Sequence, residues 1–428
     1  MKIAFVAQPW DEILSSGEHG SPIALIAYNL ARGLSTSHDV FVYARRGSGQ
    51  EKYEMDSSGL RIHRFQVRSK YVYRLLDCLT GFWNLSPPFL ASPYYYYHYG
   101  QKVARSLARE KVEIVHLFTF FQFAPVIRTL NPKVKIVLHK QDEMLSLLPP
   151  RIVRTVLPSI DLFIGCSEYI TARIRGRYPE IAGRCHTVFN GVDPNRFTDS
   201  RTGRATERGS QILFVGRLSP EKGIHILIDA FRRLLERFPD SRLDLIGAAG
   251  LLPYSYYLGL TQDRPSLSLH QFYGVTLWGK IKRQLLQKNT SYLAELRNGL
   301  SQEIQRRITF HGPIHNRDVA EFYRKADVFV FPSVWNEPFG LPTIEAMASG
   351  LPIVATRGGG TPEFLKDGVS GILVDRGNFQ ALAEAISKLL IDPQLRTRMG
   401  EAGRALVLKS LTWDRVAAEL GSYYTVLL

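Results

Sequence analysis

Two acidic residues in the second half of the chain have the spacing of a ligand-binding pair. In the segment Glu337-Pro-Phe-Gly-Leu-Pro-Thr-Ile-Glu345, seven residues separate the two glutamates. The residue types predict a turn over Phe339–Pro342 and a helix that begins at Thr343 or Ile344, so that Glu345 lies in the first turn. Such a terminus attracts anions, and carboxylates there suit the paired hydroxyls of a ribose or hexose. In the alternative, Glu345 only favours the helix start and Glu337 is a solvated loop residue.

A basic loop bounded by glycines follows a predicted strand earlier in the same half. The loop Gly216-Arg217-Leu218-Ser219-Pro220-Glu221-Lys222-Gly223 comes directly after the apolar residues ILFV. In a doubly wound domain, a strand that opens into a helix is the expected position of a phosphate. The planar donors of Arg217 and the mobile charge of Lys222 could together neutralise a diphosphate leaving group. An ordinary charged surface loop is the alternative interpretation.

Short β-branched segments recur along the chain, and helical patterns follow them. Segments that are apolar on both faces are typical of buried parallel strands, and their alternation with helices predicts an α/β protein with doubly wound sheets. The predicted strands are Lys2–Ala7, Asp39–Ala44, Arg61–Phe65, Glu113–Phe118, Val134–His139, Leu162–Cys166, Gln211–Val215, Arg242–Gly247, Ile308–His311, Val328–Phe331, Pro352–Ala355 and Gly371–Val374.

The predicted organisation is two Rossmann-like domains that face a central cleft. The first covers residues 1–197 and the second residues 211–405, and the polar stretch 198–210 links them. Residues 406–428 are predicted as a C-terminal segment whose helix, from about Thr412, packs back toward the first domain through Trp413, Val416 and Leu420. Residues 248–307 interrupt the second series of strands and are rich in aromatic side chains. A loop this long can be a lid or acceptor contact, or packing decoration or a partner surface, and the pattern leaves these alternatives open.

Together, the two motifs resemble the retaining GT-B glycosyltransferases of family GT4, the glycosyl transferases group 1. Members carry a Gly-Arg-x4-Lys-Gly loop and a Glu-x7-Glu segment that reads like EPFGLPxxEAMA. Further similar segments follow in the family's order and spacing: Asn190–Asp193 with Phe197, Phe310–Ile314, Gly358–Glu363 and Asp367–Val374. The resemblance covers the second half nearly end to end. It implies that the first domain lies on the acceptor side and that the second domain binds a nucleotide sugar.

The resemblance also implies roles for single residues. Arg217 and Lys222 would bind the donor diphosphate and stabilise its charge as it leaves, while Glu337 contacts the transferred sugar and Glu345 the ribose. The implied catalytic set is His139, Arg217, Lys222 and Glu337. The implied donor-binding set is Gly20, Gly216, Arg217, Lys222, Gly312, Ile314, Glu337, Phe339, Gly340, Leu341 and Glu345.

The N-terminal half resembles the family less closely. The family's Gly-Gly turn is replaced by single glycines, and Gly20 is the positional counterpart because a helix follows at once from Pro22. His139 resembles the histidine that reaches the donor sugar in relatives, but the usual His-Asp pair reads His-Lys-Gln-Asp here. The residues assigned to the acceptor are Arg151, Tyr95 and Asp142.

The implied reaction needs neither a cofactor nor a metal, and the Asp-x-Asp motif of the other large glycosyltransferase fold does not occur in the sequence. UDP is the commonest donor nucleotide in the family, and GDP and ADP relatives exist. The acceptor could be a phosphosugar such as fructose 6-phosphate, as in sucrose-phosphate synthases, a membrane lipid, a growing polysaccharide or a secondary metabolite. A nucleotide-sugar 2-epimerase of the same architecture and a non-catalytic nucleotide-binding scaffold are the alternatives.

Composition and charge narrow the class of protein and its partners. The 428 residues, 45% hydrophobic and 22% charged, indicate a folded protein of two or three domains without a membrane-spanning stretch. The three cysteines are too dispersed for a disulfide framework or a zinc site, so a reducing cytoplasm is expected. The net charge of +15 is concentrated in the N-terminal half, and no nucleic-acid recognition motif accompanies it. The basic, aromatic segment Arg61–Leu85 could meet an anionic membrane peripherally, bind a phosphorylated acceptor or form a solvated face.

Overall fold

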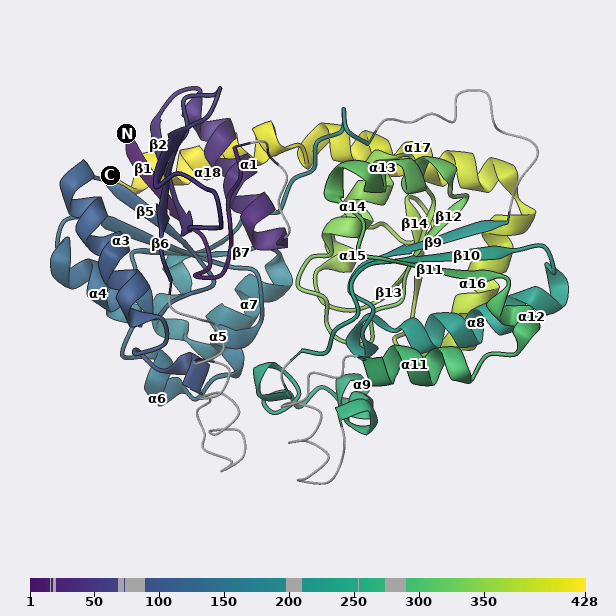
Figure 1. The fold of residues 1–428 in the computed structure, drawn as a ribbon. Coiled ribbons are helices and arrows are strands. Elements are labelled where there is room, and N and C mark those ends of the chain that lie inside the picture. The colour runs from purple at the N-terminus through teal and green to yellow at the C-terminus, as the bar shows by residue number, and fades with distance from the viewer. Residues whose placement is uncertain are drawn as a thin grey trace. The chain divides into compact units, whose positions relative to one another are not determined.

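The computed structural model divides the chain into two compact α/β units (Figure 1). Unit 1 consists of residues 1–191 and 413–428, and unit 2 of residues 192–412. Residues 192–197, expected at the end of the first domain, therefore belong to unit 2. The structure describes residues 1–15, 17, 21–67, 73, 89–197, 210–252, 254–273 and 290–428.

Several predictions from the sequence fall outside these residues. They concern Gly20, nearly all of the linker at 198–210, and most of the basic segment Arg61–Leu85 beyond residue 67.

Unit 1 is built on an eight-stranded sheet with the order β3-β4-β2-β1-β5-β6-β7-β8. All neighbouring strands run parallel except β3 and β4, which are antiparallel. Every residue of the central strand β5 is buried, as expected for a strand covered on both faces. The strands are β1 (Lys2–Val6), β2 (Asp39–Arg45), β3 (Tyr53–Met55), β4 (Arg61–Phe65), β5 (Ile114–Phe118), β6 (Lys135–Lys140), β7 (Leu162–Gly165) and β8 (Cys185–Thr187).

The helices of unit 1 include the last helix of the chain, which packs against the first. A Cβ at Gly33 would lie 2.6 Å from the Cβ of Ala417, so a glycine at this position permits the close approach of α1 and α18. Trp413, Val416 and Leu420 are buried on the inner face of α18. The helices are α1 (Pro22–Ser35), α3 (Tyr97–Glu110), α4 (Phe123–Leu130), α5 (Met144–Leu147), α6 (Pro150–Val153), α7 (Glu168–Arg177) and α18 (Trp413–Leu427).

Unit 2 holds a six-stranded parallel sheet with the order β11-β10-β9-β12-β13-β14. This is the strand order 3-2-1-4-5-6 of a dinucleotide-binding Rossmann domain, and it reverses between β9 and β12. The strands are β9 (Gln211–Val215), β10 (Arg242–Ile246), β11 (Ile308–Gly312), β12 (Val328–Phe331), β13 (Ile353–Thr356) and β14 (Gly371–Val374).

The helices of unit 2 include those that connect these strands. Three of the helices that the structure describes lie in the aromatic insertion. Those three are α9 (Arg264–Leu267), α11 (Thr290–Asn298) and α12 (Gln302–Gln305). The others are α8 (Ile224–Arg237), α13 (Asn316–Lys325), α14 (Leu341–Ala348), α15 (Thr361–Phe364), α16 (Phe379–Ile391) and α17 (Pro393–Ser410).

The last helix begins close to Thr412, as predicted, but the C-terminal segment predicted over residues 406–428 also includes the end of the preceding helix. Helix α17 ends at Ser410 and α18 begins at Trp413. Between them, the Leu411 carbonyl accepts a hydrogen bond from Val192 N at 2.8 Å, and Thr412 forms a β-bridge with Val192. Pairing with an extended segment requires the chain to leave the helical conformation, and this pairing falls where the chain passes from unit 2 to unit 1.

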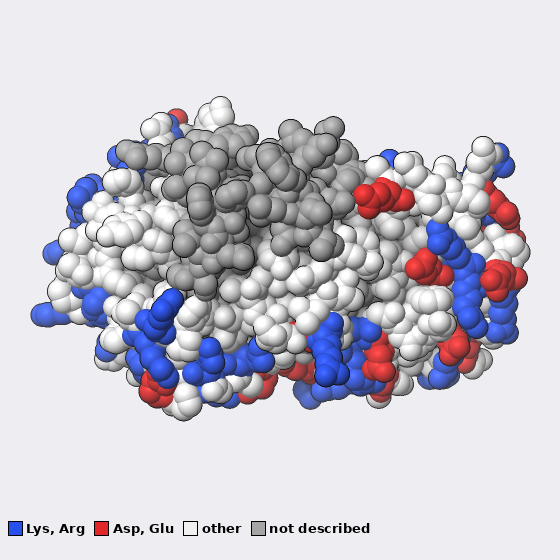
Figure 2. All heavy atoms as spheres, turned by 90° about the horizontal axis from the view of Figure 1, so that it is seen from below, with Lys and Arg blue, Asp and Glu red and all other residues white. Residues whose placement is uncertain are grey.

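The surface charge is not gathered in one patch on the face shown in Figure 2, where basic side chains are spread along the rim with acidic side chains among them. Within the described residues, no helix is long and apolar enough to cross a membrane.

Candidate active site

The candidate site of unit 2 lies where the strand order reverses. Adjacent parallel strands β9 and β12 end at the same edge of the sheet, and their loops lead to α8 and α14. Ligands of doubly wound sheets bind at this switch point, because the loops diverge there and leave room between them. The first loop carries Arg217 and Lys222, and the second carries Glu337. The topology therefore brings both sequence motifs to one place.

Glycine lets the two loops approach each other. Gly223 has a φ of 74°, and a Cβ there would overlap the carbonyl oxygen of Pro332 at the start of the second loop. Any other residue would push the loops apart or strain the backbone. The short 3-10 turn Pro220–Lys222 comes directly before Gly223, so this close approach sets the position of Lys222.

Lys222 and Glu337 form an ion pair across the two loops. The ammonium of Lys222 contacts Glu337 Oε2, and the side chains are only 12% and 10% exposed. The same carboxylate oxygen accepts hydrogen bonds from Ser333 Oγ at 3.2 Å and from Trp335 Nε1 at 2.8 Å. Lys222 Nζ also lies 4.9 Å from the centroid of the Trp335 ring, within cation–π range. Glu337 is therefore not a solvated loop residue, because its carboxylate is held by three side chains.

Arg217 is held by a different carboxylate. Its Nη2 lies 2.8 Å from Glu221 Oε1, and its Nε donates to Ser219 Oγ at 3.4 Å. The Glu221 side chain is 2% exposed, whereas that of Arg217 is 35% exposed. Part of the guanidinium therefore remains accessible to a ligand while the buried carboxylate fixes its direction. The preceding residue, Gly216, has a φ of 153° and donates its N–H to Ile246 O at 2.9 Å.

The helix that carries Glu345 begins earlier than predicted. Helix α14 starts at Leu341, and its N-cap, Gly340, has a φ of 94°. Pro342 is inside the first turn, where its missing N–H costs nothing, and no acidic residue lies in that turn. The prediction that Glu345 lies in the first turn is therefore wrong.

Glu345 is anchored by a buried tyrosine of α13. Tyr323 donates its hydroxyl hydrogen to Glu345 Oε2 at 2.8 Å, and the Tyr323 side chain is fully buried. Burial raises the pKa of Glu345 above its usual value, although the hydrogen bond from Tyr323 acts in the opposite direction. The two acids of the motif thus have separate partners: Glu337 is held by loop residues and Glu345 by a helix.

A glycine loop between β13 and α15 supports the backbone of Glu337. Gly360 N donates to the Glu337 carbonyl at 2.8 Å, and Gly359 N donates to Asn336 Oδ1 at 3.2 Å. Gly359 has a φ of 61°, and a Cβ there would overlap the Glu337 carbonyl oxygen. The segment Gly358–Glu363, noted in the sequence for its resemblance, is therefore in direct contact with the acid.

Apart from Gly20, which lies outside the described residues, the remaining predicted donor residues also lie in unit 2. Gly312 ends β11 with a φ of 72°, and its carbonyl accepts Gly247 N at 2.9 Å. Ile314 is half-buried in the loop before α13. Phe339 is buried against Phe364, with ring centroids 4.8 Å apart, so only its backbone is placed to meet a ligand.

In unit 1, His139 lies inside a buried hydrogen-bonded chain rather than at a free surface. Its Nδ1 is 3.1 Å from His116 Nε2, and its Nε2 is 3.0 Å from the Gln141 amide nitrogen. His116 Nδ1 is 2.6 Å from the hydroxyl of Tyr424 on α18. Burial lowers the pKa of His139 to about 3, so the imidazole is neutral at pH 7. A direct contact between this imidazole and a sugar would require one of these hydrogen bonds to break.

Among the described residues, the three acceptor candidates have different partners. Asp142 forms an ion pair with the buried Lys140 at 2.9 Å and accepts Met144 N at 2.9 Å. Tyr95 is buried, and its ring stacks on Phe120 with centroids 6.1 Å apart. Arg151 is exposed on α6.

Sequence reasoning missed the residues that hold the predicted ones. Trp335 and Ser333 bind Glu337, Glu221 binds Arg217, and Tyr323 binds Glu345. Trp335, Ser333 and Glu221 could have been predicted from the sequence, because they are polar residues within or next to the two motifs. Tyr323 could not, since it is one of several apolar residues on an amphipathic helix.

These two doubly wound units, with basic and acidic loops at the switch point of the second, define the fold class as GT-B. Two family models match the chain in succession: Glycosyltransferase Family 4 over residues 23–196 and Glycosyl transferases group 1 over residues 195–406. The chain belongs to the glycosyl transferases group 1, the GT4-like glycosyltransferases of the GT-B fold.

The chain is similar to enzymes with different named substrates. The D-inositol 3-phosphate glycosyltransferase of Corynebacterium urealyticum is 30% identical over 296 residues, which are 67% of this chain and 60% of that protein. The GDP-mannose-dependent alpha-(1-6)-phosphatidylinositol monomannoside mannosyltransferase of Mycolicibacterium smegmatis is 26% identical over 414 residues, 90% of each chain. The solved structure of the sucrose-phosphate synthase from Thermosynechococcus elongatus matches with a TM-score of 0.67 at 20% identity, covering 100% of this chain and 99% of that one.

Proposed function

We propose that the protein is a retaining, metal-independent glycosyltransferase that moves a hexose from a UDP-sugar onto a phosphorylated acceptor. The observation that carries the proposal is the meeting of Lys222 and Glu337 at the switch point, with Arg217 in the same loop. The pair combines a cation for a phosphate with a carboxylate for sugar hydroxyls.

Arg217 and Lys222 would act on the leaving nucleoside diphosphate. Cleavage of the bond between the anomeric carbon and the phosphate oxygen leaves negative charge on the diphosphate, and fixed cations stabilise that charge most strongly where water is excluded. The planar donors of Arg217 suit two phosphate oxygens, and Glu221 fixes their direction. The reaction implied by the family resemblance needs no metal, and the sequence lacks the Asp-x-Asp motif, so these two cations would stabilise the leaving charge.

The two acids would hold the rest of the donor. Glu337 would accept hydrogen bonds from hydroxyls of the transferred hexose, and Glu345 from the ribose hydroxyls. A site that pairs hydroxyls with carboxylates discriminates strongly against analogues that lack the hydroxyl, because a buried acceptor is then left unpaired. Retention of anomeric configuration is the stereochemistry of the family that the chain belongs to.

Support for a phosphorylated acceptor comes from a relative and from a pocket in unit 1. The relative from Corynebacterium urealyticum is named for D-inositol 3-phosphate. The pocket holds about 250 Å³ and is lined by Tyr96, Tyr99, Lys102 and Arg105, among others. Lys102 and Arg105 are exposed there, and two cations suit a phosphate. A membrane lipid is the second acceptor class, because the relative from Mycolicibacterium smegmatis is named for a phosphatidylinositol mannoside.

A donor and acceptor screen tests the proposal. The protein is incubated with UDP-, GDP- and ADP-hexoses in the presence of EDTA, and release of the nucleoside diphosphate is followed. Each donor is then paired with fructose 6-phosphate, D-inositol 3-phosphate or vesicles of phosphatidylinositol, and the anomeric configuration of the product is read by NMR. Transfer from a UDP-hexose to a soluble phosphorylated acceptor with retention is expected. Transfer only to vesicles, a strict requirement for Mg²⁺ or Mn²⁺, or conversion of the sugar nucleotide into its 2-epimer would overturn the corresponding part.

A further inference from the structure

The aromatic insertion of unit 2 lies against the two loops that form the candidate site. The ring of Tyr257 meets Trp335 edge-on, with centroids 5.1 Å apart, and the Tyr273 hydroxyl donates to Glu221 Oε2 at 3.4 Å. Trp335 donates to Glu337, and Glu221 holds Arg217. The insertion therefore contacts the residues that fix the predicted catalytic groups.

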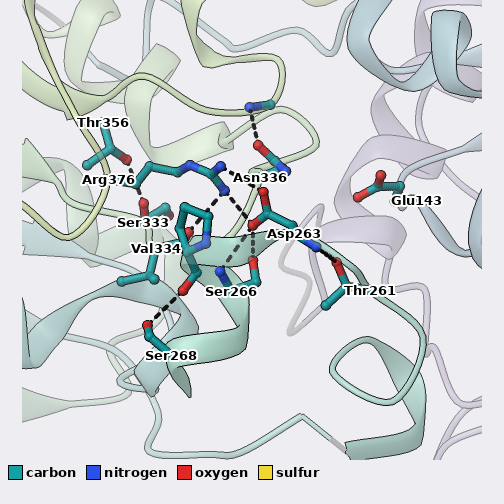
Figure 3. A network of polar contacts seen from close by, with 12 residues as sticks. Glu143, Thr261, Asp263, Ser266, Ser268, Ser333, Val334, Asn336, Thr356 and Arg376 are labelled. Carbon is teal, nitrogen blue, oxygen red and sulfur yellow. Dashed lines mark hydrogen bonds and ion pairs between the residues drawn. The ribbon is translucent and has the colours of Figure 1, made fainter. Parts of the chain in front are cut away.

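A bidentate ion pair fastens the insertion to the rest of the unit. Asp263 and Arg376 are joined by two hydrogen bonds of 2.8 Å, and their side chains are only 19% and 13% exposed (Figure 3). Asp263 also accepts Ser266 N at 3.1 Å as the N-cap of α9. Burial alone would raise the pKa of Asp263, but the hydrogen bonds from Arg376 and Ser266 outweigh it and lower that pKa below its usual value. Asp263 is therefore ionised at neutral pH.

Arg376 also contacts both loops that hold Glu337. Its Nη1 donates to the carbonyl of Val334 at 3.2 Å, next to Trp335. Its side chain packs beneath Gly358, where a Cβ would lie 2.7 Å from Arg376 Cδ. Gly358 leads into the glycine loop whose Gly360 binds the Glu337 carbonyl. One guanidinium thus joins the insertion, the Glu337 loop and the glycine loop.

We propose that Asp263 and Arg376 are positioning residues that clamp the insertion onto the Glu337 loop and fix the acid for hexose transfer. The clamp acts through Val334, which accepts from Arg376, and through its neighbour Trp335, which donates to Glu337. The described part of the insertion around Asp263 is then a fixed brace and not a lid. The proposal rests on the proposed function for its effect on turnover, but the clamp can also be measured without turnover.

The pair can be broken from either side. Asp263→Asn removes the charge and keeps an oxygen that can cap α9, while Arg376→Gln removes the fork that reaches Val334. Arg376→Lys retains the charge but cannot bind both carboxylate oxygens in parallel. A matched control is Arg128→Gln, which breaks the Arg128–Asp161 pair of unit 1, whose side chains are 26% and 28% exposed.

Hydrogen exchange and kinetics of the full chain together decide the proposal. We expect exchange over residues 332–340 to become at least about tenfold faster in Asp263→Asn and Arg376→Gln, with the double variant no worse than either single one, as for residues of one unit. We expect kcat to fall about tenfold or more with the dissociation constant for UDP changed less than threefold, and Arg376→Lys to recover part of the loss. Arg128→Gln should lower Tm without either effect.

Unchanged exchange over 332–340 in both single variants, or a kcat equal to wild type, would overturn the clamp. If the pair were merely structural, breaking it would lower Tm and leave both the exchange over residues 332–340 and kcat unchanged. If the wild-type protein transfers no sugar from any donor, the proposed function fails, and the exchange measurement still decides the clamp by itself.

Discussion

At the scale of residues, the candidate site depends on charges whose partners lie on different loops. Lys222 and Glu337 are 115 positions apart in sequence, yet they meet because β9 and β12 are neighbours in the sheet. Each charge is largely withdrawn from water, where an uncompensated ion is costly. A donor diphosphate that takes over the Lys222 ammonium would release Glu337 toward the sugar, so one ion pair can prepare both groups for binding.

Replacing the lysine tests this assignment directly. Lys222→Ala should lower kcat/KM by at least about a hundredfold, which is the scale of one lost electrostatic contact to a developing charge. Glu337 keeps its hydrogen bonds to Ser333 and Trp335, so the protein should remain folded. Steady-state kinetics and thermal unfolding are measured side by side. Lys325→Ala, which breaks an exposed pair with Glu321, is the control and should leave kinetics unchanged. A fully active Lys222→Ala protein would end the diphosphate assignment.

Glu345 can be tested through the hydroxyls it is expected to hold. Glu345→Gln should weaken UDP binding about tenfold, the scale of one hydrogen bond to a charged group. The affinity for 2′-deoxy-UDP should already be low in the wild-type protein and should change little in the variant. The reason is that this nucleotide lacks the hydroxyl that Glu345 would hold, so neither protein can make the contact. Calorimetric titration of the four combinations gives the coupling. Equal losses for both nucleotides would show that Glu345 does not bind the 2′-hydroxyl.

The sequence predicted the charged residues of the site better than their surroundings. Arg217, Lys222 and Glu337 were found because they lie in short motifs with chemical content. Tyr323 was not found, because its hydroxyl reaches Glu345 across a helix packing contact that no local pattern encodes. Gly20 lies outside the described residues, and its role stays a prediction.

At the scale of elements, the strands were predictable where both faces are apolar. Gln211–Val215, Val328–Phe331 and Gly371–Val374 have the bounds predicted for them, and so does Arg61–Phe65, although two arginines and a histidine interrupt its apolar residues. Strands β3 and β8 were missed because they are three residues long and carry polar side chains, so they show no apolar run. The early start of α14 was missed because it depends on the left-handed conformation of Gly340, which any loop glycine could adopt.

The glycine loop allows a test at this scale. Gly359→Ala and Gly368→Ala both place a side chain at a positive φ, of 61° and 75°, so both should cost about 1 kcal/mol of backbone strain. Only at Gly359 would the new Cβ overlap the Glu337 carbonyl, whereas nothing lies within 4 Å at Gly368. Gly359→Ala should therefore lose activity beyond its loss of Tm, and Gly368→Ala should lose only Tm. Steady-state kinetics and Tm are measured for both variants. Equal activities of Gly359→Ala and Gly368→Ala would contradict a role for the glycine loop in holding Glu337.

At the scale of the whole molecule, buried neutral histidines link the stability of both units to pH. In unit 1, burial lowers the pKa of His139 to about 3 and that of His116 well below its usual value. In unit 2, burial lowers the pKa of His225 to about 4. His139 is hydrogen-bonded to His116 and Gln141, and His225 to Tyr292, so these uncharged partners suit the neutral form of each imidazole.

The sign of the pH dependence follows from these lowered values. At pH values between the folded pKa of a histidine and its unfolded pKa near 6.5, the unfolded chain binds more protons than the folded chain. The contribution of the neutral histidine to folding stability is therefore fully present above about pH 6.5 and is lost as the pH falls. At pH 5 His139 and His225 should each cost on the order of 2 kcal/mol relative to pH 8, at about 1.4 kcal/mol per pKa unit. His225→Gln should remove one of these contributions, because the amide can still bond to Tyr292 and does not titrate.

Urea unfolding at pH 8.0, 6.5 and 5.0 measures the effect. The wild-type protein should lose stability steadily below pH 6.5, and His225→Gln should lose less, so that the two curves converge or cross on the acid side. His98→Asn, which removes an exposed histidine of unit 1, is the control and should follow the wild-type curve. Parallel curves for wild type and His225→Gln would show that this histidine titrates alike in the folded and unfolded chains, and that its burial against Tyr292 does not control its charge.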